Sequence, residues 1–379
     1  MSRGLGLALP GLPQLLRGKI MEGGFCLFLW VSSLLVLVFR YERIVEAPGG
    51  SLDDQIAMAT LILATVGVWL WSFKEWKRVA SEPASAQFVA IGTIERGWAA
   101  YRTNRLAVLS LYVVVVLYLA MLLAPFLVSS GPAGPDWEGM SDLSLHLLPP
   151  SLAHPFGTDN YQKDVLSKIL YGARISLSLG LLAVGISVTL GAFLGAVAGY
   201  WGGRTDTVIM RVVDMVMAFP RLVLLIAIVA LFEPDFFVVV LALAITQWPY
   251  TTRLVRGEIL SLREREYAEA ARALGFSDWR ILFRHLLPNA MGPLIVVATL
   301  GVGNTIILEA GLSFLGLGVS VGTPSWGVLV DEGRTYVLEQ WWVSTFPGLA
   351  IVLAVLAFNL VGDGLRDAYD PRQAGRSSS

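Results

Sequence analysis

The chain has 379 residues, of which 55% are hydrophobic and only 15% are charged, and its mean hydropathy is +0.65. A soluble protein of this length needs more charge to cover its surface, so the composition predicts a membrane protein. The formal net charge of -1 provides no basic field for phosphates, which excludes nucleic acid as a partner. The single cysteine, Cys26, excludes an intrachain disulfide, and the scattered histidines predict no metal site.

About eight apolar stretches are predicted to cross the membrane, since each approaches the ~20 residues that span ~30 Å of hydrocarbon. In chain order they are 23–39, 56–73, 106–128, 175–198, 212–231, 236–250, 293–311 and 343–361. The first has no small-residue cleavage site before Arg40, so we interpret it as a retained span and not as a signal peptide. The predicted fold is all-α, a polytopic bundle of transmembrane helices.

The orientation of the bundle is predicted from the distribution of Lys and Arg. These residues gather before residue 23, at 74–105, 204–211 and 253–284, and after residue 364, whereas the alternate loops carry mostly Asp and Glu. Basic loops stay on the cytoplasmic side of a membrane. We therefore expect a multi-pass protein of the cell inner (plasma) membrane with both termini, and the loop 253–290, in the cytoplasm.

The loop 253–290 is charged and helix-forming, and it is longer than a simple connection between two spans. Four apolar residues at i, i+3, i+4 and i+7 predict the stripe of a short amphipathic helix: Tyr267, Ala270, Ala271 and Leu274. Gly275 follows where a helix favours a glycine with left-handed backbone.

A second short helix is predicted directly after this glycine. Ser277 or Asp278 would cap its start, and Pro288 would end it. Its apolar stripe would consist of Trp279, Leu282, Phe283 and Leu286. The loop is thus predicted to be two helices joined at a glycine corner.

The same residues resemble the signature of a known family. Glu269-Ala270-Ala271, then Gly275, then Leu287-Pro288 is similar to the EAA signature of binding-protein-dependent ABC importer permeases, with His285 in a slot that is commonly isoleucine. Segments such as 156–159, 170–177, 195–200, 214–220, 312–318, 324–327 and 359–371 resemble the dipeptide/oligopeptide subgroup. The resemblance covers roughly residues 103–372. The chain departs from it at Gln162-Lys163, where a Gly-Arg pair is usual, and before Ser81, where the ordinary subunit has no counterpart.

The resemblance implies a type I ABC importer permease with two additional N-terminal spans. Its parts would be an N-terminal extension with a cytoplasmic connector (1–102), a first core span with an external loop (103–170), an ABC transmembrane domain containing the coupling loop 253–290 (171–364), and a cytoplasmic tail (365–379). The two extra spans would form a packing collar or a docking site.

The partners and the substrate are likewise implied by the resemblance. A homologous permease subunit would complete the passage, an extracytoplasmic binding protein would deliver peptides, and lipid would surround the bundle. ABC ATPase subunits would dock on Glu269, Ala270, Ala271, Gly275, Leu287 and Pro288, and these subunits would hold ATP and Mg. Nickel or another small solute is the alternative substrate within the subgroup. An ATP-independent secondary transporter is the alternative of a different class, although it would have no use for this loop.

This chain is itself predicted to be neither an enzyme nor a cofactor-binding protein. It has no G-x-x-x-x-G-K-[ST] phosphate loop, no Ser/His/Asp set and no H-E-x-x-H motif. Ionisable residues within spans usually face a passage or a partner. Glu309, with Thr305 one turn before it and Asn304 at the edge of that face, therefore either lines the passage or ties two helices together near the outer surface.

Overall fold

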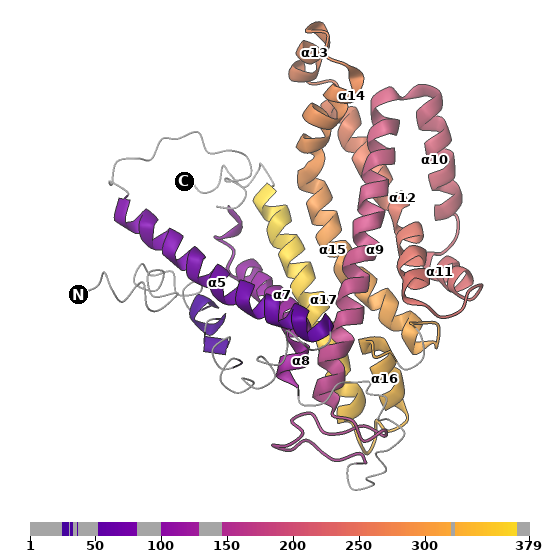
Figure 1. Ribbon diagram of the computed structural model, residues 1–379. Coiled ribbons are helices and arrows are strands. Elements are labelled where there is room, and N and C mark those ends of the chain that lie inside the picture. Colours follow the sequence, from indigo (N-terminus) through magenta and orange to yellow (C-terminus); the bar gives the residue numbers. More distant parts are fainter. Residues whose placement is uncertain are drawn as a thin grey trace.

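The computed structural model describes residues 25–29, 31–32, 36, 52–81, 100–128, 146–319 and 323–369, and this part of the chain is built from helices (Figure 1). Five of its helices are long and apolar enough to cross a membrane. They are α7 (Arg105–Leu122), α9 (Val165–Trp201), α12 (Phe236–Leu262), the run Asp278–Phe314 that ends in α15 (Met291–Phe314), and α17 (Trp342–Tyr369). The all-α bundle is thereby confirmed.

The predicted span 212–231 is not one continuous helix, because two helices bent by 82° occupy this part of the chain. Helix α10 (Gly203–Met217) ends just before Pro220, and α11 (Arg221–Val229) begins after it. Proline has no N–H to donate and keeps the residue before it out of the α region, so the helix cannot continue through this point. The pair counts as one broken span at most.

The other span predictions differ from the structure mainly at their ends. The short span 236–250 is in fact α12, which continues through Pro249 to Leu262 and so includes the start of the predicted loop 253–290. The extra span 56–73 lies within α5 (Leu52–Ser81), but only Asp54–Val68 counts as a short apolar helix. The extra span 23–39 lies mostly outside the described residues. In the part of the chain that the structure describes, five helices therefore qualify as spans, or six if the bent pair is one span, against seven predicted there.

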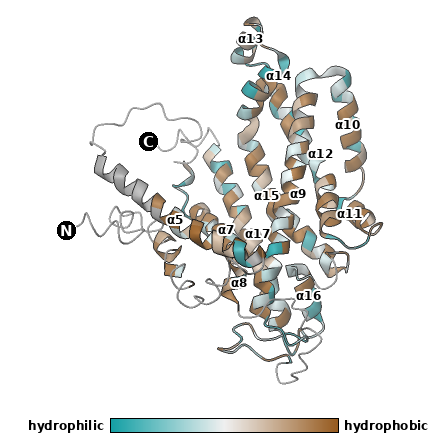
Figure 2. Cartoon of the chain, in the orientation of Figure 1, coloured by the Kyte–Doolittle hydropathy of each residue, from teal (hydrophilic) through white to brown (hydrophobic). Residues whose placement is uncertain are grey.

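Helices α9 and α12 pack with their backbones close together, and three glycines at four-residue spacing make this possible. A Cβ atom on Gly195 would lie 2.5 Å from the carbonyl oxygen of Thr252, and one on Gly199 would lie 2.8 Å from that of Arg256. A Cβ atom on Gly191 would likewise lie 2.6 Å from the side chain of Thr251. Small residues at such contacts allow close helix packing in a membrane. Apolar residues predominate along these helices and α15 (Figure 2).

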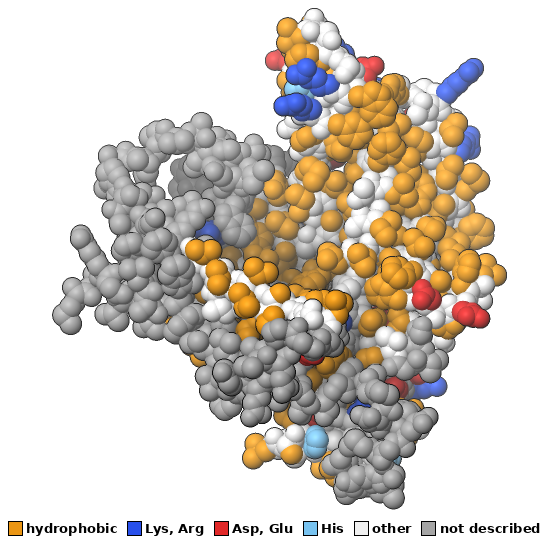
Figure 3. Space-filling view, viewed as in Figure 1, with side chains coloured by type: hydrophobic (Ala, Val, Ile, Leu, Met, Phe, Trp, Pro, Cys, Tyr) orange, Lys and Arg blue, Asp and Glu red, His pale blue; other side chains and the backbone are white. Residues whose placement is uncertain are grey.

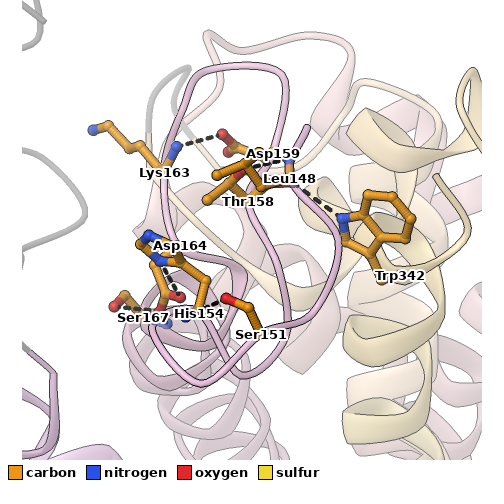
Figure 4. A network of polar contacts seen from close by, with 9 residues as sticks. All are labelled: Leu148, Ser151, His154, Thr158, Asp159, Lys163, Asp164, Ser167 and Trp342. Carbon is orange, nitrogen blue, oxygen red and sulfur yellow. Dashed lines mark hydrogen bonds and ion pairs between the residues drawn. The ribbon is translucent and has the colours of Figure 1, made fainter. Parts of the chain in front are cut away.

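The N-terminal end of α9 is fixed by a folded loop, residues 146–164 (Figure 4). Asp164 caps the helix by accepting from the backbone N–H of Ser167 at 2.8 Å, and the indole of Trp342 donates to the carbonyl of Thr158 at 3.2 Å. Lys168 in α9 donates to Asp159 and to Glu332 of α16 (Trp326–Arg334), both at 2.6 Å. One buried cation therefore joins the loop to two helices at this end of the bundle.

Candidate functional site

The first candidate site is the part of the predicted coupling loop 253–290 that follows α12, residues 263–290, which is called the coupling segment below. It protrudes from the opposite end of the bundle (Figure 1). It contains α13 (Glu266–Ala273), α14 (Asp278–Ile281), the π-turn η4 (Leu282–Leu286) and the 3-10 turn η5 (Leu287–Ala290). Lys and Arg side chains gather at this end, and the surface of the helices next to it is mostly hydrophobic (Figure 3). This distribution agrees with the charge pattern on which the predicted orientation rests.

The corner between α13 and α14 has the geometry that the sequence predicts. Gly275 has a φ of +74°, in the left-handed region that favours glycine. Its N–H donates to the carbonyl of Arg272 at 2.9 Å, and the N–H of Phe276 donates to that of Ala271 at 3.2 Å. This pair of bonds is the Schellman ending of a helix, which satisfies carbonyls that would otherwise have no partner. The glycine thus fixes the angle at which the chain leaves α13.

The prediction that Pro288 ends the second helix is wrong. The N–H of Leu287 donates to Leu282, which is a π-type bond, and η5 then leads directly into α15. Pro288 lies in the first turn of η5, where a missing N–H removes no helical hydrogen bond. The run Asp278–Phe314 therefore passes from the coupling segment into the membrane without a break in helical structure.

The inner face of the coupling segment is packed on the transmembrane helices. Its buried residues share one apolar cluster with side chains of α9 and α12. The cluster contains Ala192, Ala196, Val255, Ile259, Ala268, Ala271, Ile281, Leu282, Leu286, Ala290 and Leu294. Because protein interiors are close-packed, a displacement of this segment would disturb its contacts with both helices.

Polar and aromatic contacts strengthen the attachment at the end of α9. The guanidinium of Arg263 donates to the carbonyl of Gly199 at 3.0 Å. The hydroxyl of Tyr200 donates to Asp278 at 2.6 Å, and the rings of Trp201 and Trp279 lie 4.9 Å apart. The coupling segment and the end of α9 therefore form one packed unit.

The outer face of α13 carries the predicted apolar stripe, but the stripe points away from the bundle. Tyr267 is 41% exposed, Leu274 is 73% exposed, and Ala270 between them is also exposed. Ala271 departs from this arrangement, because it is 5% exposed and belongs to the inner cluster. The expectation that all four stripe residues share one face is thus wrong for Ala271. Of the other predicted coupling residues, Glu269 and Pro288 are exposed and Leu287 is half-buried.

The second candidate site is a membrane cavity of about 490 Å³ beside the break between α10 and α11. Its lining includes Arg221, Gln247, Tyr250, Gly301 and Asn304. Asn304, which the sequence predicted near the passage, therefore faces this cavity. Thr305 is buried, and its hydroxyl lies 3.0 Å from the amide oxygen of Gln247, so it contacts the lining from behind.

Glu309 does not line this cavity. Its side chain is fully buried, and it accepts hydrogen bonds from Ser176 of α9 at 3.1 Å and from Ser313 of its own helix at 2.8 Å. These contacts support the alternative in which Glu309 ties two helices together.

Arg221 and Gln247 were not predicted from the sequence, although one signal was present. Arg221 lies within the apolar stretch 212–231, and the rule that draws attention to Glu309 applies equally to an intramembrane arginine. The sequence gives no such signal for Gln247, because its amide is uncharged and its hydrogen-bond partners are known only from the structure.

Comparison with known proteins places the chain in a family. Residues 191–375 match the family described as "Binding-protein-dependent transport system inner membrane component", and residues 94–150 match the N-terminal transmembrane domain of oligopeptide transport permease C. A probable D,D-dipeptide transport system permease protein of Escherichia coli is 42% identical over 72% of this chain and 90% of its own length. This chain belongs to the family of binding-protein-dependent transport permeases.

Other relatives of the permease agree with this placement. A dipeptide transport system permease protein of Alkalihalophilus pseudofirmus is 41% identical over 77% of this chain and 94% of its own. A glutathione transport system permease protein of Pectobacterium atrosepticum is 46% identical over 59% and 74%. The resemblance inferred from the EAA-like signature is thereby confirmed. Residues 1–93 lie outside both family matches, so the permease has an N-terminal part that these families do not describe.

Proposed function

We propose that this permease forms, with a homologous subunit, the membrane passage of an ATP-driven importer of short peptides. Separate ATPase subunits bind its coupling segment from the cytoplasm and hold the ATP and Mg. An extracytoplasmic binding protein delivers the substrate at the opposite end, and both termini lie in the cytoplasm. The chain itself binds no cofactor and catalyses no reaction.

The observation that carries this proposal is the exposed stripe on α13. Tyr267, Ala270 and Leu274 form an apolar surface on a short helix that protrudes from the bundle. Such an unpartnered face, beside charged residues, is typical of a helix that docks in a groove of another protein. The small side chain of Ala270 would let the groove approach the helix backbone closely.

The inner face of the same segment supports the transmission of movement. Ala268 and Ala271 of α13 pack with Val255 and Ile259 of α12, and the second half of the segment continues into α15. An ATPase that moved α13 would therefore move transmembrane helices with it. This arrangement favours an ATP-driven importer over a secondary transporter.

The peptide substrate is proposed from the relatives, whose names include transport of dipeptides and of glutathione, itself a small peptide. Proteins of one fold carry sites for different ligands, and the relatives already differ in the peptide that their names print. We therefore propose the class of short peptides and not one member of it.

Reconstitution tests the proposal. The permease would be co-purified with its homologous subunit and ATPase subunits, placed in proteoliposomes, and supplied with binding protein and a labelled dipeptide. We expect uptake that requires ATP, and ATP hydrolysis that the loaded binding protein stimulates. Uptake without ATPase subunits would identify a secondary transporter, and stimulation by a metal ion in place of a peptide would identify the alternative solute class.

A further inference from the structure

The membrane cavity has one charged side chain in a mostly apolar lining, and a passage through the bundle does not by itself require such a charge. It lies at the level of Gln247, close to the middle of α12, which is long and apolar enough to cross a membrane. Most of its lining is apolar, as Val216, Phe219, Leu224, Val297 and Leu300 show. Arg221 is the one charged residue among those that line it.

Arg221 is half-buried and has few partners for a cation in this position. Its Nη2 donates to the amide oxygen of Gln247 at 2.9 Å, while its Nε is enclosed without a hydrogen-bond partner among the described residues. No carboxylate in the described part of the chain forms an ion pair with it. A guanidinium has five N–H donors, so most of its capacity remains available.

The neighbouring residues hold the acceptor of this arginine in position. Thr305 lies 3.0 Å from the same amide oxygen of Gln247. Gly301 leaves the room for the amide, since a Cβ atom there would lie 2.7 Å from the amide nitrogen of Gln247. The position of Gln247 is thus fixed from two sides, and Gln247 in turn orients the guanidinium at the cavity.

An arginine in this setting is unfavourable unless something compensates its charge. Charged side chains within a membrane are retained where they pair with another group or with a transported ligand. One neutral amide oxygen is a weak substitute for a carboxylate, which accepts two parallel hydrogen bonds from a guanidinium. The guanidinium of Arg221 therefore lies at the cavity with one neutral acceptor as its hydrogen-bond partner among the described residues.

We propose that Arg221 binds the terminal carboxylate of a peptide as it passes through this cavity. The inference rests on the proposed function, and it names a substrate-contacting residue within the passage. The volume of about 490 Å³ suits a short peptide, since small-molecule sites measure about 300–1,000 Å³. The exposed rings of Phe219 and Tyr250 and the amide of Asn304 complete a lining that contacts side chains of different kinds.

The test compares a dipeptide with its C-terminal amide in proteoliposomes that contain the complete transporter. The variants are Arg221→Gln, Arg221→Lys, and Arg253→Gln as a control that removes an arginine outside the cavity lining. The same binding protein serves every sample, so its own preference for free carboxylates cancels when variants are compared.

We expect Arg221→Gln to lower uptake of the free dipeptide at least about tenfold, the effect of one lost charge-assisted hydrogen bond, with little effect on the amide. Arg221→Lys should retain part of the preference for the free acid, and Arg253→Gln should retain all of it. Equal loss of both substrates, or no loss of either, would overturn the inference. Absence of peptide uptake by the wild-type transporter would instead overturn the proposed function.

A second measurement uses the wild-type protein and does not depend on how the variant folds. A dipeptide with a C-terminal benzoyl-phenylalanine would be photolysed during transport, and the modified residues would be mapped by mass spectrometry. We expect modification of Met217, Tyr250 or Asn304, which line the cavity. Modification confined to residues outside the cavity lining would contradict the proposal.

Discussion

At the scale of single residues, Gly275 shows how one backbone conformation determines the shape of a docking element. A Cβ atom at this position would meet nothing within 4 Å, so space does not require a glycine there. The backbone conformation requires a glycine, because the φ of +74° lies in the left-handed region, where a residue with a side chain is strained.

We expect Gly275→Val to destabilise the corner by about 1 kcal/mol or more and to reduce coupling several-fold. Gly275→Asn is the matched control, since asparagine enters the left-handed region more readily than other residues. ATP hydrolysis stimulated by loaded binding protein is the measurement. Equal activity of the two variants would show that the angle of this corner is not important for coupling.

Lys168 is a second residue whose contribution can be measured. It lies between Asp159, which is almost fully buried, and the partly buried Glu332. Lys168→Met would leave these carboxylates without their cation, and breaking a buried pair in this way costs about 3–5 kcal/mol.

The expected result for Lys168→Met is a clearly lower melting temperature of the purified permease. Combining it with Asp159→Asn should restore part of the loss, because the second substitution removes the uncompensated charge. A melting temperature that is unchanged in Lys168→Met would mean that the network does not hold the loop to α9.

At the scale of elements, α13 separates two functions onto two faces. Ala270 belongs to the exposed stripe, whereas the adjacent Ala271 is packed in the inner cluster. The two alanines of one motif should therefore respond differently to the same substitution.

Ala270→Trp should leave the melting temperature of the permease unchanged but weaken its co-purification with the ATPase subunits, because the added ring would obstruct the groove. Ala271→Trp should destabilise the permease itself, by about 1–3 kcal/mol as overpacked cores do. If both variants lose only ATPase binding, then both alanines face the partner, and the assignment of faces is wrong.

At the scale of the whole molecule, orientation can be tested at two exposed positions at opposite ends of α9. Leu152 is fully exposed in the loop that precedes α9, and Leu274 is 73% exposed in the coupling segment that packs on its other end. In a Cys26→Ser background, Leu152→Cys should react with an impermeant thiol reagent in intact cells. Leu274→Cys should react only after the cells are opened. The reverse pattern would show that the termini lie outside.

The N-terminal part of the permease is expected to be dispensable for its assembly. Both family matches begin at or after residue 94, and α5 contacts the rest through a small cluster of Ala57 and Leu61 with Phe126. A chain that starts at Ala84 should therefore insert and co-purify with its partners, because lipid can replace those apolar contacts. Failure of this shortened chain to assemble would show that the N-terminal helices are integral to the permease.

The sequence by itself determined the class of fold, the family and the glycine corner. Each of these depends on local information: apolar length, a spaced signature, or the need of one residue for a left-handed backbone. The sequence could not locate the C-terminal end of α12. Its last turns are charged, and they remain helical because they pack on α9. The sequence also placed Ala271 on the wrong face, since spacing defines a stripe but not what covers it.

Only the tertiary structure decided which polar residues meet. Arg221, Gln247 and Thr305 lie far apart in the chain. The bend between α10 and α11 brings Arg221 against Gln247 of α12, which Thr305 of α15 also contacts. Glu309 was conspicuous in the sequence, yet folding encloses it among serines. Long-range proximity of this kind arises from helix packing, which hydropathy along a single chain does not specify.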